Sequence, residues 1–241
     1  MIDMNLNHQK TLSNTLPEFN LYELIGLIIG DGHIIYDKKY VLEITGNADE
    51  DREYFNKVSD FIKKETGKTP QIRFHKDKRG KYIRLCFHNK EYIEFLIYKL
   101  GLVYKNKTFE SEIPKKFVDW IYMKHIIRGL FEADGSLYFS KERREKHYYP
   151  RFEIKSSSPK IISQVMTSLK SQGFRVTLRR CGEERTFGIH LCGFNMLEKW
   201  IKEIGFGSFR NYSKYLVRNR LNFYIPKMNL KERIDLLRRS K

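Results

Sequence analysis

Two aspartates that are each followed by glycine, Asp31 and Asp134, are the residues of this sequence most suited to chemistry. Each closes an apolar run with two very small residues four positions apart: Gly26 and Gly30, or Gly129 and Ala133. Residues four apart share one helix face, so each run predicts a helix with a strip of small side chains. If the strips pack together, the two aspartates meet at the helix C-termini, with Gly32 and Gly135 as expected left-handed caps.

A pair of carboxylates in that position requires a positive partner. The helix dipole opposes negative charge at a C-terminus, and two neighbouring carboxylates repel each other. Paired carboxylates with open coordination positions suit Mg²⁺, which can activate water and stabilise a phosphoryl transition state. The sequence therefore predicts a metal-dependent hydrolytic site at Asp31 and Asp134.

The elements that must position this pair occur twice. Residues 24–32 (LIGLIIGDG) return 103 positions later as residues 127–135 (IRGLFEADG). Strand-like runs at 40–45, 71–76 and 81–88 correspond to runs at 149–155, 174–179 and 187–192. Helical patterns at 50–66 and 90–100 correspond to patterns at 159–172 and 195–204. The expected fold is α+β, with two αββαββα halves.

The repeat sets the expected domain boundaries. An N-terminal arm (1–17) precedes the first half (18–103), a connector (104–114) leads to the second half (115–225), and a basic tail (226–241) follows. The arm and the tail carry no recognisable motif. The connector has no clear periodicity and ends in proline.

Both apolar runs resemble the LAGLIDADG motif, and the elements after them follow the order of the LAGLIDADG homing endonuclease family over roughly residues 18–225. One run ending in Asp-Gly is weak evidence, whereas two runs in similar halves are specific. The resemblance implies two pseudo-symmetric halves that form a DNA-binding saddle of antiparallel strands, with the motif helices at the interface.

The resemblance also implies roles for the residues at the motif ends. Asp31 and Asp134 would bind the metal ions and each serve one DNA strand, and the carbonyls of Gly30 and Ala133 would touch metal. Two or three divalent ions are expected, with Mg²⁺ as cofactor, Mn²⁺ as a substitute and Ca²⁺ as an ion that binds without supporting cleavage.

Basic and polar residues near the metals vary in this family. Lys105 and Arg210 occupy equivalent places after the last helix of each half and are the predicted basic catalytic residues. Asn47 and Ser156 are candidates for ordering solvent, and Gly46 stands where the family often has glutamine.

Strand alternation predicts a DNA-reading face, because side chains opposite the apolar positions point away from the core. The predicted contacts are Gln71, Arg73, His75, Tyr82, Arg84 and His88 in the first half and Lys155, Arg175, Thr177, Arg179 and His190 in the second. The apolar side chains between them, including Phe74 and Leu178, are expected to face the core. Turn residues suited to phosphate contact are Lys78, Arg79, Lys81 and Arg180.

Composition agrees with a nucleic-acid partner. Lys and Arg total 46 against 29 Asp and Glu, giving a net charge of +17. The sequence has no apolar run long enough to span a membrane and no secretory signal, so we expect an intracellular protein, cytoplasmic or organellar. The three cysteines, without CxxC spacing, are expected to be reduced structural thiols.

The combined prediction is a monomeric, site-specific endonuclease that cuts both strands of a long, asymmetric double-stranded DNA target. By resemblance the cut leaves short 3′ overhangs and serves intron homing. With no further splicing domain, we expect a freestanding enzyme rather than an intein. The alternatives are an RNA maturase, which would add intron RNA as a partner, and a catalytically dead DNA-binding regulator.

Overall fold

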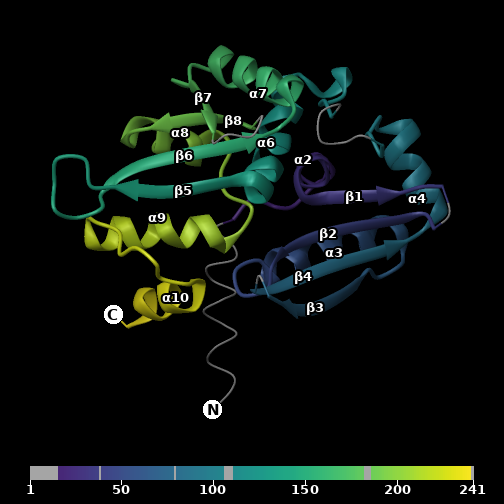
Figure 1. Ribbon diagram of the computed structural model, residues 1–241, viewed down its shortest axis with the longest axis horizontal. Helices are drawn as coiled ribbons and strands as arrows, with labels where there is room; N and C mark the ends of the chain where they lie inside the picture. The colour runs from purple at the N-terminus through teal and green to yellow at the C-terminus, as the bar shows by residue number, and fades with distance from the viewer. Residues whose placement is uncertain (1–15, 38, 79, 106–110, 182–185, 240–241) are drawn as a thin grey trace.

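The computed structural model describes residues 16–37, 39–78, 80–105, 111–181 and 186–239, with only the backbone of Cys181. It contains two four-stranded antiparallel sheets, each with the same strand order (Figure 1). The first sheet, in the order β1-β2-β4-β3, consists of β1 (Gly32–Ile35), β2 (Val41–Asn47), β3 (Gln71–Asp77) and β4 (Gly80–His88). The second, in the order β5-β6-β8-β7, consists of β5 (Gly135–Ser140), β6 (Tyr149–Ser156), β7 (Thr177–Cys181) and β8 (Thr186–Cys192).

The helices confirm the predicted order in both halves and add two more. The motif helices are α2 (Leu21–Asp31) and α6 (Trp120–Asp134). The other elements of the two halves are α3 (Arg52–Thr66), α4 (Lys90–Glu94) with the π-helical turn η1 (Phe95–Lys99), the 3-10 turn η2 (Lys115–Phe117), α7 (Pro159–Ser171) and α8 (Phe194–Glu203). The helices α9 (Phe209–Leu221) and α10 (Leu230–Arg238) follow, and sequence analysis predicted neither.

The motif helices α2 and α6 pack directly against each other through their small residues, as predicted. A Cβ on Gly26 would lie 2.1 Å from the carbonyl oxygen of Ile126, and one on Gly129 would lie 2.0 Å from that of Glu23. Both distances are far shorter than any van der Waals contact, so only glycine allows this backbone approach. The interface of the two helices therefore joins the two halves.

The prediction of left-handed caps at Gly32 and Gly135 is wrong. Gly32 has φ −81° and ψ 152°, and Gly135 has φ −100° and ψ 162°, which are extended conformations. The chain passes from each motif helix straight into the first strand of its sheet. Glycine is needed there for space, because a Cβ would lie 2.6 Å from the Cα of Ile28 or 2.4 Å from the ring of Phe131.

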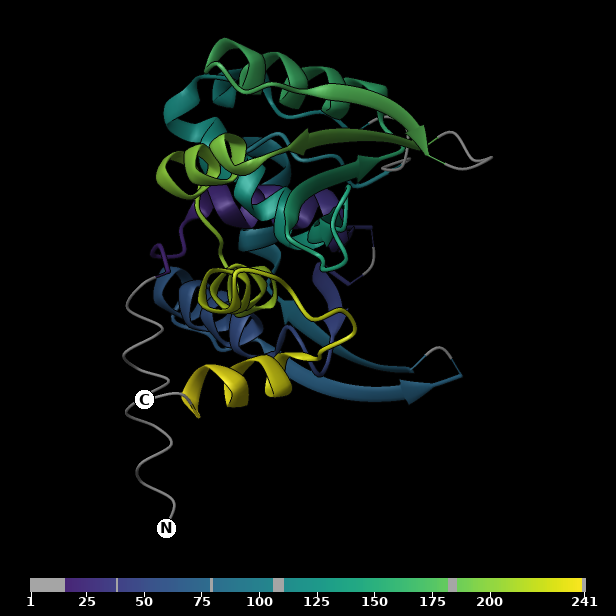
Figure 2. The same ribbon diagram turned by 90° about the vertical axis from the view of Figure 1, so that its left-hand side faces the viewer.

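The helices cover one face of each sheet and leave the other face open. Figure 2 shows the β3–β4 and β7–β8 hairpins extending outward on the same side of the molecule, away from α3 and α8. The covered face carries buried apolar residues such as Ile44 and Leu85 in the first half and Ile154 and Ile189 in the second. The open faces are the surfaces on which the predicted DNA contacts were placed.

Two apolar side chains depart from the predicted burial. Phe74 pairs across the strands with Ile83, and Leu178 pairs with Ile189, so both share the covered face. They are nevertheless 52% and 48% exposed. The reason is that β3 and β7 are edge strands, and the guanidinium of Arg52 lies over the Phe74 ring at 5.1 Å instead of a hydrophobic neighbour. The strand expected at 174–179 starts later, at Thr177.

Cys86 is a buried thiol, as expected of a structural cysteine, whereas Cys192 is exposed; both are unbridged. None of the helices in the described ranges combines the length and apolarity needed to cross a bilayer.

Substitution of Gly129 by alanine tests the helix contact. We expect Gly129→Ala to lower the free energy of unfolding by about 3 kcal/mol, since the added methyl must push two backbones apart. Urea denaturation measures the effect, and Ser163→Ala, at an exposed position of α7, is the control. A loss no larger than that of the control would contradict the close packing.

Candidate functional site

The packed motif helices bring the two predicted aspartates to one end of their interface. Asp31 and Asp134 are the last residues of α2 and α6, and both are exposed. A Cβ on Gly30 would lie 2.3 Å from the Cβ of Ala133 and 3.1 Å from Oδ2 of Asp134. The carboxylate of Asp134 therefore lies against the end of the other motif helix, where the predicted carbonyl ligands, Gly30 and Ala133, also meet.

A small polar cavity opens beside Asp134, with a volume of about 240 Å³. Its lining combines both halves: Ile29, Gly30, Asp134, Lys155, Ser156, Ser157 and Thr186. The end of β6 contributes Lys155, which alternation had assigned to the DNA face, and Ser156, which was a candidate for ordering solvent. The cavity thus brings one carboxylate, one ammonium group and several hydroxyls together.

This donor set fits Mg²⁺ better than a metal that needs a dense ligand cluster. Among the described residues, no three or more His, Cys, Asp or Glu side chains gather closely enough to hold an ion. Mg²⁺ typically keeps several waters and binds through one or two carboxylates together with substrate phosphates. Asp31, Asp134 and the carbonyls before them offer that arrangement.

Arg210, at the start of α9, is the predicted basic residue that the structure places at the motif helices. Its guanidinium lies 3.3 Å from the carboxylate of Asp51 and also donates to the carbonyl oxygen of Glu132, two residues before Asp134. Burial opposes its charge, yet the carboxylates of Asp51, Glu132 and Asp31 hold the pKa of Arg210 above its ordinary value. Arg210 is therefore a fixed cation within the field of Asp31.

Glu132 explains how α9 is attached there. This buried carboxylate accepts from the backbone N–H of Gly207 at 2.9 Å and from the hydroxyl of Ser208 at 2.5 Å. Ser208 also caps α9 by accepting from the N–H of Arg210 at 3.2 Å. Sequence analysis assigned no role to Glu132. An acidic residue on an apolar helix was the signal that could have predicted a buried polar partner.

A second buried acid joins the two halves. Glu23 on α2 pairs with Arg128 on α6 at 2.8 Å, and the hydroxyl of Tyr54 donates to it at 3.0 Å. Arg128 also donates to the carbonyl of Ile204 at 2.9 Å. Burial, only partly offset by Arg128, raises the pKa of Glu23 to about 7.

Lys105 has different surroundings from Arg210, although the two are equivalent in the repeat. Its ammonium group lies 3.3 Å from Asp37, and the side chain is 65% exposed. It lines a cavity of about 450 Å³ beside β1, together with His33 and Tyr104. Its catalytic role stays a prediction.

The other two positions from the resemblance have local structural roles. The side-chain carbonyl of Asn47 accepts from the N–H groups of Asp49 and Glu50 at 2.9 and 3.1 Å and so closes the turn after β2. A Cβ on Gly46 would lie 2.7 Å from the Phe55 ring, which leaves no room there for the glutamine that the family often has.

Most of the residues predicted to contact DNA lie on the open faces of the two sheets. In the first half, Gln71, Arg73 and His75 lie directly opposite Cys86, Arg84 and Tyr82. In the second half, Thr177 and Glu153 both pair with His190, and Lys155 and Arg179 both pair with Gly188. His88 is exposed at the end of β4, and Arg175 is exposed just before β7.

Three of these side chains form a stack on the first sheet. The rings of His75 and Tyr82 lie 4.9 Å apart and nearly parallel, and the guanidinium of Arg84 lies 5.7 Å from the Tyr82 ring. Within the described part of the chain, His75 Nε2 and Arg84 Nε have no hydrogen-bond partner. Polar atoms left in this state on an open face are suited to binding a ligand.

The predicted phosphate-contacting residues are not all in turns. Lys78 lies in the β3–β4 turn, and Arg79 lies outside the described residues. Lys81 and Arg180 lie within β4 and β7, next to Tyr82 and Arg179, so they point to the covered face instead. Lys81 pairs there with Asp49 at 3.9 Å.

Sequence analysis missed two acids at matching positions of the open faces. Glu43 lies opposite Cys86, and Glu153 lies opposite His190. Glu153 is 3.3 Å from both Lys155 and His190. Strand alternation marks both acids as outward-facing, but the prediction considered only basic and neutral residues.

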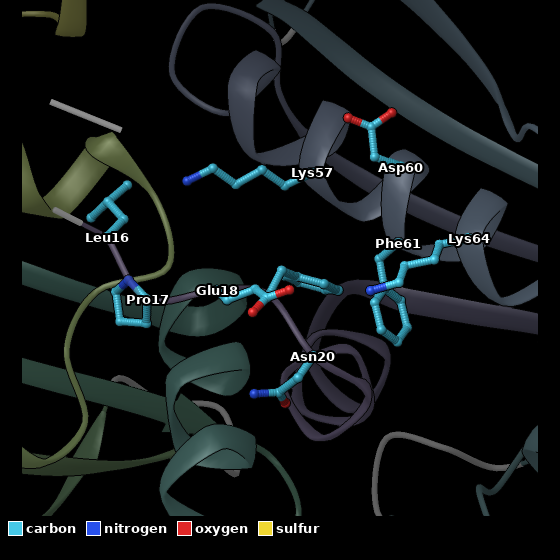
Figure 3. Close-up of a pocket in the computed structure, with 9 residues that line it drawn as sticks. Leu16, Pro17, Glu18, Asn20, Lys57, Asp60, Phe61 and Lys64 are labelled. Atoms are coloured by element: carbon cyan, nitrogen blue, oxygen red, sulfur yellow. The ribbon is translucent and has the colours of Figure 1, made fainter. Parts of the chain in front are cut away.

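A larger cavity, of about 640 Å³, lies away from Asp31 and Asp134 (Figure 3). It is lined by residues 16–20 and by side chains of α3, including Lys57, Asp60 and Lys64. Charged side chains line this cavity as well, but neither Asp31 nor Asp134 is among its lining residues.

Comparison with known proteins identifies the fold. Residues 122–205 match the family described as LAGLIDADG-like domain. No curated protein sequence matches the chain. The crystal structure of I-DmoI in complex with DNA and Mn has a TM-score of 0.53 and 17% identity, covering 76% of this chain and 94% of that chain.

Another similar structure is the N-terminal LAGLIDADG domain of DUF199/WhiA, with a TM-score of 0.51 and 15% identity over 76% of this chain and 79% of that chain. Full-length DUF199/WhiA from Thermatoga maritima has a TM-score of 0.53 and 16% identity over 90% of this chain and 64% of that chain. The two-half α+β fold is thus confirmed as the LAGLIDADG fold.

The raised pKa of Glu23 predicts a pH-dependent stability. Between its ordinary value of 4.5 and about 7, the folded chain retains a proton that the unfolded chain has released. Because Glu23 must release this proton as the pH rises through that range, its contribution to the free energy of unfolding declines. The free energy of unfolding of the wild type minus that of Glu23→Gln should be smaller at pH 8 than at pH 5 in urea denaturation. A difference that is constant or grows with pH would refute this assignment.

Proposed function

We propose that this chain, which has the LAGLIDADG fold and whose residues 122–205 match the LAGLIDADG-like domain family, is a metal-dependent endonuclease that cuts both strands of a specific, asymmetric DNA site. The observation that carries the proposal is the convergence of Asp31 and Asp134 at the ends of two helices that only glycine lets pack so closely. The enzyme would act as a monomer, because one chain supplies both aspartates.

The open faces of the two sheets are the proposed DNA-binding surface. They carry Arg, His, Gln, Thr and Tyr side chains, which suit hydrogen bonding to base edges in a major groove. The net charge of +17 favours binding to a polyanion. The fold relative I-DmoI is described in complex with DNA, and the same mode of binding is proposed for this chain.

The chain's own groups have distinct proposed tasks at the scissile phosphates. Asp31, Asp134 and the carbonyls of Gly30 and Ala133 would hold Mg²⁺, which supplies an activated water and charge stabilisation. Lys155 lines the cavity beside Asp134, and Arg210 lies in the field of Asp31, so each aspartate has one nearby cation to stabilise a phosphate.

The finer details of the proposal follow from the resemblance. They are short 3′ overhangs, a role in intron homing, Mn²⁺ as a substitute and Ca²⁺ as a binding but inactive ion. Structures of I-DmoI with Mg, Mn and Ca support the choice of divalent ions. The intracellular location stays a prediction.

Binding without cutting is the second candidate. The fold is shared by I-DmoI and by the LAGLIDADG domain of DUF199/WhiA, so the fold alone does not imply cleavage, and a DNA-binding regulator is the alternative. An RNA maturase would also keep the basic open faces. Both alternatives predict a folded, nucleic-acid-binding chain that leaves DNA intact with Mg²⁺.

Cleavage of a randomised double-stranded DNA library with Mg²⁺ tests the main proposal. The wild type should cut a defined set of sequences, and Asp31→Asn or Asp134→Asn should each lower double-strand cutting by about 10³-fold or more. Asp60→Asn, on the exposed face of α3, is the control and should cut normally. A wild type that binds DNA and never cuts would move the function to regulator or maturase.

The basic residues are tested in the same assay under single-turnover conditions. Arg210→Met and Lys155→Met should each slow cleavage by about 10²-fold, with Lys63→Met on α3 as the charge-matched control. Circular dichroism and binding of uncut DNA with Ca²⁺ would establish that the variants fold. Lys105→Met tests the predicted catalytic role of Lys105. If this variant slows cleavage as much as Arg210→Met does, Lys105 and Arg210 have equivalent roles in the two halves. If cleavage slows by less than about threefold, the role in question belongs to Lys155.

A further inference from the structure

The C-terminal segment, in which sequence analysis predicted no element, contains a well-formed helix that packs on the second half. In α10, the side chain of Asn229 accepts from the N–H of Glu232, and the carboxylate of Glu232 accepts from the N–H of Asn229. Figures 1 and 2 both show α10 alongside α9. At the far end of the pair, Arg220 donates to the carbonyl of Leu237 at 2.5 Å.

One buried arginine connects α10 to its surroundings. Arg233 is 2% exposed, and its Nε donates to the hydroxyl of Ser213 on α9 at 2.8 Å. Its other nitrogens donate to the carbonyl of Met228 and, at 3.2 Å, to the carbonyl of Arg210. The same guanidinium pairs with the carboxylate of Glu50.

Glu50 belongs to the first half, in the turn between β2 and α3. Its second carboxylate oxygen accepts from the N–H of Leu230 at 2.8 Å, so one acid holds both the first turn of α10 and Arg233. The α10 helix therefore ties the second half to the first.

Asp51, the residue after Glu50, contacts the same arginine of the second half that Arg233 contacts. Asp51 pairs with the guanidinium of Arg210, while Arg233, held by Glu50, binds the carbonyl of Arg210. Asp51 thus holds the charged end of Arg210 directly, and Glu50 holds its backbone carbonyl through Arg233. The other end of its guanidinium rests on the carbonyl of Glu132, at the end of α6.

We propose that α10 is a strap across the two halves and that Arg233 is a positioning residue, which holds Arg210 in place for cleavage. The effect on cleavage rests on the proposed endonuclease function, whereas the strap does not. Misplacing a catalytic group by about 1 Å can cost about 10²-fold in rate, so a distant anchor can matter. A lysine at this position keeps the charge beside Glu50 but lacks the planar fork that reaches Ser213 and Arg210 together.

The test compares Arg233→Gln, Arg233→Lys and Glu50→Gln with Lys231→Gln, an exposed, charge-matched control on the same helix. Arg233→Gln and Glu50→Gln should slow single-turnover cleavage by about tenfold or more, while the Kd for uncut target with Ca²⁺ changes by less than about threefold. Arg233→Lys should recover part of the rate. The double variant of Arg233→Gln and Glu50→Gln should cleave no more slowly than the slower single variant, because both substitutions break the same Glu50–Arg233 pair.

Three results would overturn the positioning role: full cleavage rates in the folded variants, losses matched by equal losses of DNA affinity, or losses that multiply in the double variant. Hydrogen exchange of residues 210–213 tests the strap without any cleavage. In Arg233→Gln these amides should exchange about tenfold faster than in Lys231→Gln. If the wild type cuts no DNA, the endonuclease proposal fails, but faster exchange still supports the strap and unchanged exchange rejects it.

Discussion

The rest of the structure depends on a contact between two backbones, that of α2 with that of α6. Gly26 and Gly129 lie where any Cβ would fall about 2 Å from a carbonyl oxygen of the opposite helix. This approach sets the distance between the sheets, because β1 and β5 begin at the residues directly after the motif helices. It also brings two carboxylates to one place, which a wider helix pair would keep apart.

Buried charged residues lie among the apolar side chains of the two motif helices. Glu23 pairs with Arg128 across the motif helices, and Glu132 holds the loop before α9. Breaking a buried pair on one side leaves an uncompensated charge, which is strongly destabilising. Arg128 thereby holds the chain at Ile204, and Glu132 fixes, through Ser208, where α9 starts.

The two halves repeat in topology but not in the surroundings of their aspartates. Arg210 is anchored by Asp51 and Glu132, whereas its counterpart in the repeat, Lys105, pairs with Asp37 beside β1. Only the second half is followed by α9 and α10, and α10 reaches back to Glu50 of the first. In the proposed endonuclease, unequal halves within one chain would treat the two DNA strands differently, which two identical subunits could not.

The sequence by itself determined what depends on local pattern: the duplicated motif, the order of helices and strands, the two aspartates and the alternation of the open faces. These follow from small-residue spacing and from side-chain periodicity, which neighbours in the chain impose. The extended conformation of Gly32 and Gly135, the exposure of Phe74 and the ion pair of Lys81 with Asp49 depended on what packs beside each residue. The grouping of Glu50, Asp51, Arg210 and Arg233 joins residues up to 183 positions apart, and only the folded chain brings them together.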